Sequence, residues 1–303
     1  MEGEQTEVVV SPLAPTGRTW RSRQLGADLS LLLVTAIWGT TFVLVKQVTE
    51  VLPPLTFIAL RFSIGFLALA ALFPLRLRRA TRREWAAGLL MGLFLGGGFL
   101  SQTYGLQTTN ASIAAFITGL STVLVPFSAY FVLRYQPGTG ALLGVGLATT
   151  GLALMTIKDD LSLGQGDLLV LFCALCFALH ITVVGKYAPR LDAVALAVIQ
   201  VGAVAVAAWP LALLLERPVL ATSAEVWANV LFLGAVATGL VFFIQTLAQR
   251  LTSPTHTAII FTMEPVFAAL FAYLWLGETI AGRGLIGAAL VLAGMLAAEL
   301  WPS

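Results

Sequence analysis

Long apolar stretches alternate with short polar segments along almost the whole chain. A helix that crosses about 30 Å of hydrocarbon needs about 20 mostly apolar residues, and ten stretches approach that length. The stretches are apolar on every side rather than at alternate positions, which favours helices over the strands of a membrane barrel. We therefore predict an all-α polytopic membrane protein with ten transmembrane helices, at about 27–49, 54–75, 85–106, 110–133, 139–157, 166–187, 192–215, 225–249, 254–276 and 283–302.

The composition supports this class and excludes several others. Hydrophobic residues make up 58% of the 303 residues and charged residues 11%, against about 25% charged residues in a soluble domain. So little charge excludes a soluble enzyme, a nucleic-acid binder and a disordered chain. The two cysteines, Cys173 and Cys176, lie in one apolar stretch, which predicts neither a disulfide framework nor the four ligands of a structural metal site. No cofactor is expected.

The positions of lysine and arginine predict the orientation. The first 26 residues form a polar tail with three arginines and without the apolar region of a signal peptide. If this tail is cytoplasmic, twelve of the 17 basic residues fall on the inner side and three on the outer side, as the positive-inside rule requires. We therefore expect a multi-pass protein of the cell (inner) membrane with both termini in the cytoplasm and an even number of spans.

An internal repeat divides the chain into two halves. Residues 109–151 match residues 252–294 without gaps at a shift of 143, with pairs such as Tyr130 and Tyr273 or Gly151 and Gly294. The predicted domains are residues 27–157 and 166–302, after the tail of residues 1–26. Each holds five spans, and because five is odd, the second copy is inserted upside down. Inverted repeats are typical of transporters that open to alternate sides of the membrane.

Three motifs resemble one transporter family. The stretch 36–46 reads AIWGTTFVLVK, the next span opens with two prolines and reaches Arg61 and Phe62, and the ninth span carries EPVFAAL and ends in LGE. Together they resemble the EamA-type family of the drug/metabolite transporter superfamily over residues 27–302. The resemblance implies two inverted five-helix repeats around a central cavity and the movement, usually efflux, of small metabolites such as amino acids. The first copy departs from the family by lacking LGE after its fourth span.

Three charged residues fall inside the predicted spans. A charge in hydrocarbon costs about 2.5–3.5 kcal/mol on insertion scales, so Lys46, Arg61 and Glu264 need an explanation. Arg61 lies about 10 Å below the outer surface, at 1.5 Å per residue, and Glu264 lies near the midplane. The functional interpretation of these charges is a substrate carboxylate or amine site or a proton carrier, with Glu264 as the first candidate, and gating for Lys46 and Arg61. The alternatives are a structural ion pair or, for Lys46, a side chain that reaches the interface.

Polar and aromatic residues within the spans are the other candidates. Pro126 and Pro265 interrupt the helix hydrogen bonds of the fourth and ninth spans and suit either hinges or static kinks. The remaining residues suit a cavity wall or, alternatively, hydrogen bonds between and within helices. These candidates for cavity lining are Trp38, Tyr104, Thr118, Ser121, His180, Gln200 and Gln245.

The resulting hypothesis is a secondary transporter that exports small metabolites, with amino acids as the expected class, by alternating access. Its partners are a small-molecule substrate and the lipid bilayer, without nucleic acid, and proton coupling is left open. Import or exchange of another metabolite or drug is the main alternative, because sequence does not set direction. A membrane-embedded enzyme is a weaker one, since no paired acids, nucleophile–base set or metal cluster share one depth. A membrane scaffold would leave the repeat unexplained.

Overall fold

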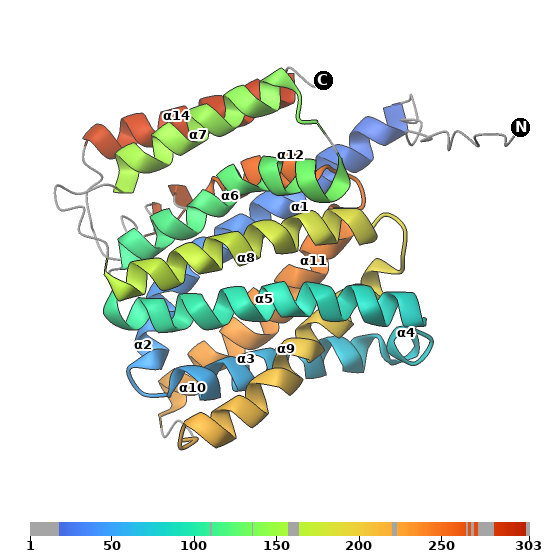
Figure 1. Ribbon diagram of the computed structural model, residues 1–303, viewed down its shortest axis with the longest axis vertical. Helices are drawn as coiled ribbons and strands as arrows, with labels where there is room; N and C mark the ends of the chain where they lie inside the picture. The colour runs from blue at the N-terminus through green and yellow to red at the C-terminus, as the bar shows by residue number, and fades with distance from the viewer. Residues whose placement is uncertain are drawn as a thin grey trace, which may run out of the picture.

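The computed structural model is a bundle of helices that run roughly parallel or antiparallel to one another (Figure 1). It describes residues 18–109, 111–134, 136–156, 164–219, 223–264, 266–267, 270–271 and 282–300. Helices joined by short turns and loops account for these residues, and none of them lies in a strand.

The first half of the chain begins with a helix that starts earlier than expected. It starts at Arg18, inside the predicted polar tail, and ends at Gly39, where one residue separates it from the next helix. The helices of this half are α1 (Arg18–Gly39), α2 (Thr41–Thr49), α3 (Pro54–Leu72), α4 (Pro74–Arg78), α5 (Arg82–Thr108), α6 (Ala111–Leu133) and α7 (Thr139–Thr156).

The second half contains two interrupted segments. The predicted eighth span is divided into two α-helices with a π-helix between them, and the ninth begins with a short helix. The helices are α8 (Gln165–Tyr187), α9 (Ala193–Leu215), α10 (Ala224–Leu231), η1 (Phe232–Leu240), α11 (Val241–Ala248), α12 (Pro254–Phe261) and α14 (Gly282–Leu300).

Six segments are long and apolar enough to cross a membrane, among the described residues. They span 23–49, 54–72, 82–108, 165–187, 193–215 and 224–248, and shorter apolar helices lie at 117–133, 142–151 and 282–294. The all-helical, multi-pass membrane class is thereby confirmed.

Short-range hydrogen bonds explain where several helices begin and end. Thr81 and Glu84 form a reciprocal cap at the start of α5: Glu84 N donates to Thr81 Oγ1 over 3.3 Å, and Thr81 N donates to Glu84 Oε2 over 2.6 Å. The Asp192 carboxylate caps α9 by accepting from Val194 N over 2.9 Å. It also pairs with Arg76 of α4 over 2.8 Å, so α4 is tied to the start of α9.

The break between α1 and α2 lies at Thr40. The amide of Thr40 donates to Ile37 O over 3.1 Å, a tighter turn than an α-helix makes. The hydroxyls of Thr40 and Thr41 donate to the carbonyls of Ile37 and Trp38 over 2.7 and 2.9 Å. Such side-chain bonds to the preceding turn compete with the helix ladder and often bend it.

Helix α12 ends at Phe261, before the predicted ninth span is half complete. Thr262 N and Met263 N make three-residue turns to Ile259 O and Ile260 O, over 3.1 and 3.0 Å. The sequence supplies a reason, because Pro265 has no amide hydrogen to donate to the carbonyl of Phe261. Pro265 itself lies outside the described residues, so its predicted hinge role stays a prediction.

Helices of the first half pack mainly against helices of the second half. Helix α7 lies beside α14 at one edge of the bundle (Figure 1), α6 contacts α8 and α12, and α1 contacts α11 and α12. Helix α5 contacts α8 and α9, and α3 contacts α9 and η1.

Candidate functional site

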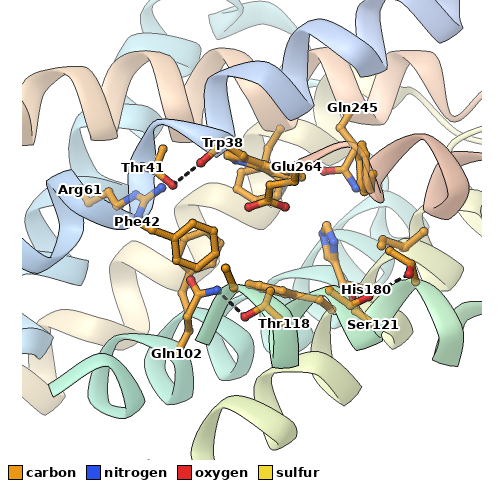
Figure 2. Close-up of a pocket in the computed structure, with 18 residues that line it drawn as sticks. Trp38, Thr41, Phe42, Arg61, Gln102, Thr118, Ser121, His180, Gln245 and Glu264 are labelled. Carbon is orange, nitrogen blue, oxygen red and sulfur yellow. Dashed lines mark hydrogen bonds between the residues drawn. The ribbon is translucent and has the colours of Figure 1, made fainter. Parts of the chain in front are cut away.

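A cavity of about 730 Å³, counted out to its opening, lies among the helices. Its lining comes from the break between α1 and α2, from α3, α5, α6, α8, α11 and α12, and from the turn after α12. Figure 2 shows these side chains converging from opposite sides of an open space. Concave sites lined mainly by apolar rings with a few polar groups are where small ligands bind.

Aromatic rings form much of the wall. The rings of Trp38 and Phe261 lie 5.1 Å apart and edge-on, and those of Trp38 and Phe242 lie 5.4 Å apart. Phe99 meets Phe177 at 5.4 Å and Phe242 at 5.8 Å. Edge-to-face contacts of this kind hold each ring in place, so the wall is a stiff apolar surface.

Arg61 brings a positive charge to this wall. Its side chain is 2% exposed, and Nε donates to Thr238 Oγ1 over 2.7 Å. Cζ lies 4.6 Å from the centre of the Phe99 ring and 5.8 Å from that of Phe57. In the described part of the chain no carboxylate lies within 4.0 Å of the guanidinium, and Thr238 is its one hydrogen-bond partner.

Glu264 brings an acidic side chain to the same cavity. Its side chain is partly buried and lines the cavity, and Figure 2 shows its carboxylate directed into the open space. Within the described ranges the carboxylate makes neither a hydrogen bond nor an ion pair. The cavity therefore contains one basic and one acidic side chain, Arg61 and Glu264, which form no ion pair with each other in the described part of the chain.

The first half of α6 supplies hydroxyl groups. Thr118 and Ser121, two of the candidates for cavity lining, both line this cavity. Thr118 Oγ1 accepts from Gln102 Nε2 over 3.0 Å, which joins α5 to α6 at the wall. Pro126 is buried farther along α6, away from the lining.

His180 lines the cavity and is fixed from behind. Its Nε2 lies 2.7 Å from Gln200 Oε1, and Gln200 Nε2 donates to Thr246 Oγ1 over 2.8 Å. Gln200 is fully buried and does not line the cavity. This chain therefore holds the His180 ring, and Gln200 acts on the cavity only through it.

Gln245 lines the cavity with an incomplete set of hydrogen bonds. Its Nε2 donates to Gln249 Oε1 over 3.0 Å, and Gln249 Nε2 donates to Ile181 O over 3.0 Å. Gln245 Oε1 is buried and has no hydrogen-bond donor among the described residues. A buried carbonyl oxygen without a donor is unfavourable in itself and is available to a ligand.

Two residues expected at the cavity or its gate lie elsewhere. The Tyr104 hydroxyl donates to Glu216 Oε1 over 3.0 Å, and the same carboxylate accepts from Leu55 N and Thr56 N over 3.0 and 2.9 Å. Tyr104 thus belongs to a cap on the start of α3. Lys46 is exposed on α2 and does not line the cavity.

Several lining residues were not singled out by the sequence. Phe42, Phe99 and Phe242 give no signal, because phenylalanine in an apolar span is as common against lipid as against a cavity. Gln102 carries a signal as an amide within a span, although the same signal marks Gln200, which lies behind the wall. No group of three or more histidine, cysteine, aspartate or glutamate residues in the described ranges is placed to hold a metal ion.

Comparison with known proteins gives consistent matches over most of the chain. The sequence model of the EamA-like transporter family matches residues 25–157 and again residues 164–298. An uncharacterized transporter of Archaeoglobus fulgidus is 30% identical over 92% of this chain and 87% of that protein. The uncharacterized transporter YoaV of Bacillus subtilis is 29% identical over 88% of this chain and 94% of that protein.

Two further matches are more limited in what they show. The uncharacterized inner membrane transporter YhbE of Escherichia coli is 30% identical over 44% of this chain and 43% of that protein. A crystal structure superimposes with a TM-score of 0.77 over 92% of this chain and 97% of that chain, at 20% sequence identity. That likeness concerns the fold alone.

Proposed function

Since the chain belongs to the EamA-like transporter family, we propose that it is a secondary transporter that exports small metabolites, with amino acids as the substrate class. Transport across a membrane is the general function of the family and of the relatives. The finer proposal includes alternating access by two inverted five-helix repeats, residues 27–157 and 166–302, in an inner membrane with both termini cytoplasmic.

The cavity is the observation that carries this proposal. It lies between helices of both segments that the family sequence model matches. It is lined by aromatic surfaces, by hydroxyl and amide groups, and by one basic and one acidic side chain, Arg61 and Glu264. An amphipathic molecule with ionised groups and an apolar side chain, such as an amino acid, matches this mixture of surfaces.

The packing of the helices supports the inverted repeat. If each helix is exchanged for its counterpart five spans away, the contact of α5 with α8 becomes that of α11 with α1. In the same way, the contact of α6 with α8 becomes that of α12 with α1. Both members of each pair are present, as expected for halves related by a two-fold axis.

Two polar contacts follow the same relation. Asp28 of α1 lies 3.1 Å from His256 Nε2 at the start of α12. Asp167, its counterpart at a shift of 139, accepts a hydrogen bond from Thr109, just before α6. Each aspartate thus links the first helix of one half to the start of the fourth helix of the other half. Both contacts are present in this structure, and their equivalent placement supports the proposed repeat.

Counterflow into liposomes tests the proposed function. The full chain is reconstituted, the liposomes are loaded with a mixture of unlabelled amino acids, and uptake of each labelled amino acid is followed with and without a pH gradient. Saturable accumulation of at least one amino acid supports the proposal. Its absence for all twenty overturns the amino-acid assignment. Net efflux from loaded liposomes without external substrate separates one-way transport from obligatory exchange.

Two glutamate variants are compared in the same assay. Glu264→Gln removes the charge in the cavity, and Glu225→Gln removes an exposed charge at the start of α10. Loss of gradient-driven uptake in the first variant alone would support a proton-coupled carrier with Glu264 as the carrier of the proton. Equal uptake by both variants would contradict a transport role for Glu264.

A further inference from the structure

The guanidinium of Arg61 has a hydrogen-bond partner at Nε and, among the described residues, none at its two Nη atoms. A guanidinium has five N–H donors and stays protonated in proteins. Nε donates to Thr238, and the N–H groups of the two Nη atoms have no acceptor among the described residues. Since the side chain is 2% exposed and lines the cavity, these donors are withdrawn from bulk water and lie at the cavity wall.

Thr238 is oriented for this contact by the π-helix. Its hydroxyl donates to Leu233 O, five residues earlier, over 2.8 Å. Because its single hydrogen is used there, its oxygen is left to accept from Arg61 Nε. The hydroxyl is therefore constrained on both sides, and it holds the guanidinium in one orientation.

Close backbone contact between α3 and η1 keeps Arg61 and Thr238 within hydrogen-bonding distance. A Cβ atom on Gly65 would lie 2.9 Å from Gly234 O and 3.1 Å from Gly239 N. A Cβ atom on Gly234 would in turn lie 2.8 Å from Arg61 O. The three glycines thus bring the turn that carries Thr238 against the turn that carries Arg61. A hydrogen bond from the indole Nε1 of Trp38 to Ala237 O, over 3.2 Å, also holds the Thr238 turn.

The described surroundings of Arg61 contain no carboxylate paired with its charge. The faces of Phe99 and Phe57 attract a cation, but they accept no directed hydrogen bonds. Glu264 lines the same cavity without forming an ion pair with Arg61. A cation in a membrane-embedded cavity is costly unless it is paired, and the Nη groups suit the two oxygens of a carboxylate.

We propose that Arg61 is an anion-binding group of the cavity, that Thr238 positions it, and that it selects substrates that carry a carboxylate. This inference rests on the proposed transport function and names the chemical class that the site accepts. A cationic amide of an amino acid, which keeps the ammonium and the side chain but lacks the carboxylate, is therefore a poor substrate.

The test uses three labelled pools in the reconstituted full chain: amino acids, the corresponding amino-acid amides, and the corresponding 2-oxo acids. The 2-oxo acids keep the carboxylate and lack the ammonium. We expect the wild-type protein to prefer the amino-acid pool to the amide pool. We expect Arg61→Gln to raise the KM for carboxylates by about 10- to 100-fold, the effect of losing charged hydrogen bonds, and to abolish the preference over amides.

Thr238 variants test the positioning role without removing the charge. Thr238→Val is expected to raise the KM for carboxylates about tenfold and to reduce the preference over amides, whereas Thr238→Ser retains the hydroxyl and restores both. Ser63→Ala is the matched control on α3, since it removes the acceptor of a bond from Trp209 Nε1 of α9 and does not line the cavity. A fall in stability alone would move total uptake in all variants, but not the ratio between acids and amides.

The outcomes separate this inference from the proposed function. Equal transport of amino acids and amides by the wild type, or a preference that survives Arg61→Gln and Thr238→Val, overturns the inference and leaves the transporter in place. Transport of 2-oxo acids alone, dependent on Arg61, supports the inference and overturns the amino-acid assignment. Transport of none of the three pools overturns both.

Discussion

Gly294 of α14 packs against the carbonyl oxygen of Gly144 in α7, so closely that a Cβ atom on Gly294 would lie 2.6 Å from that oxygen. The reverse contact is also present, because a Cβ atom on Gly151 would clash with Gly287 O. Residues 151 and 294 differ by 143, and so do residues 144 and 287. Each contact is therefore the counterpart of the other at the shift of 143. The shift found by aligning the sequence with itself thus describes a two-fold arrangement of α7 and α14.

This contact predicts that larger residues at the two glycines destabilise the protein. Gly294→Ala and Gly151→Ala each place a methyl group against backbone that cannot rotate away, at about 1–3 kcal/mol. Gly146→Ala on α7 is the control, because nothing lies within 4 Å of a Cβ atom there. Melting of the purified protein in detergent measures the effect. Equal melting temperatures for Gly294→Ala and Gly146→Ala would contradict the close contact.

The cap formed by Glu216 predicts a structural role for Tyr104. Tyr104→Phe removes one hydrogen bond to the carboxylate, which contributes about 1.5–3 kcal/mol when one partner is charged. We expect a lower melting temperature with an unchanged substrate KM. Glu216→Gln should have the larger effect. The amide retains one acceptor oxygen, whereas the carboxylate accepts from the Tyr104 hydroxyl, Leu55 N, Thr56 N and the Thr56 hydroxyl. A raised KM for Tyr104→Phe would return Tyr104 to the cavity.

The chain from His180 to Thr246 predicts how a residue behind the wall affects transport. Gln200→Leu keeps much of the side-chain volume but leaves His180 Nε2 without its partner in an enclosed site, at about 1–3 kcal/mol. Melting temperature and transport KM should change together, because the imidazole is no longer held against the cavity. Gln200→Glu preserves the acceptor oxygen and serves as the comparison. A KM identical to wild type in Gln200→Leu would show that the orientation of His180 does not matter.

The aromatic wall predicts dependence on ring shape. Phe242 contacts Trp38, Phe99 and His180, so Phe242→Ala removes the packing of three rings at once. A buried phenylalanine reduced to alanine costs about 3–5 kcal/mol, whereas Phe242→Tyr keeps the ring. We expect Phe242→Ala to unfold at a lower temperature and to lose uptake. Full uptake by Phe242→Ala would mean that the rings do not shape the binding site.

The sequence predicted the membrane class, and marked the unusual charges within the spans, for a physical reason. Hydrocarbon accepts long apolar helices and penalises charge, so both span length and the isolated charges at Arg61 and Glu264 are visible without a structure. Both residues do line the cavity. Trp38, Thr118 and Ser121 line it as well. They could be picked out from the sequence because polar or amphipathic side chains within a span are few.

Other features depend on partners that are distant in sequence. Tyr104 and Gln200 look like cavity residues until Glu216 and Thr246 are placed beside them. Likewise, a π-helix and an α-helix have the same hydropathy, so η1 has no signal in an apolar segment. The break between α1 and α2 falls at Thr40. Both Thr40 and Thr41 would be equally compatible with a continuous helix.

The π-helix also has a consequence for the length of the chain in this segment. Its hydrogen bonds reach five residues back instead of four, so η1 accommodates more residues than an α-helix over the same rise. A deletion of one residue within 235–237 would therefore return this segment to an ordinary α-helix, with α10 and α11 kept in register. An α-helix of the original residue count would instead turn everything after it by about 100° per extra residue. The π-helix is thus what lets this segment hold one more residue while Phe242 and Gln245 still face the cavity.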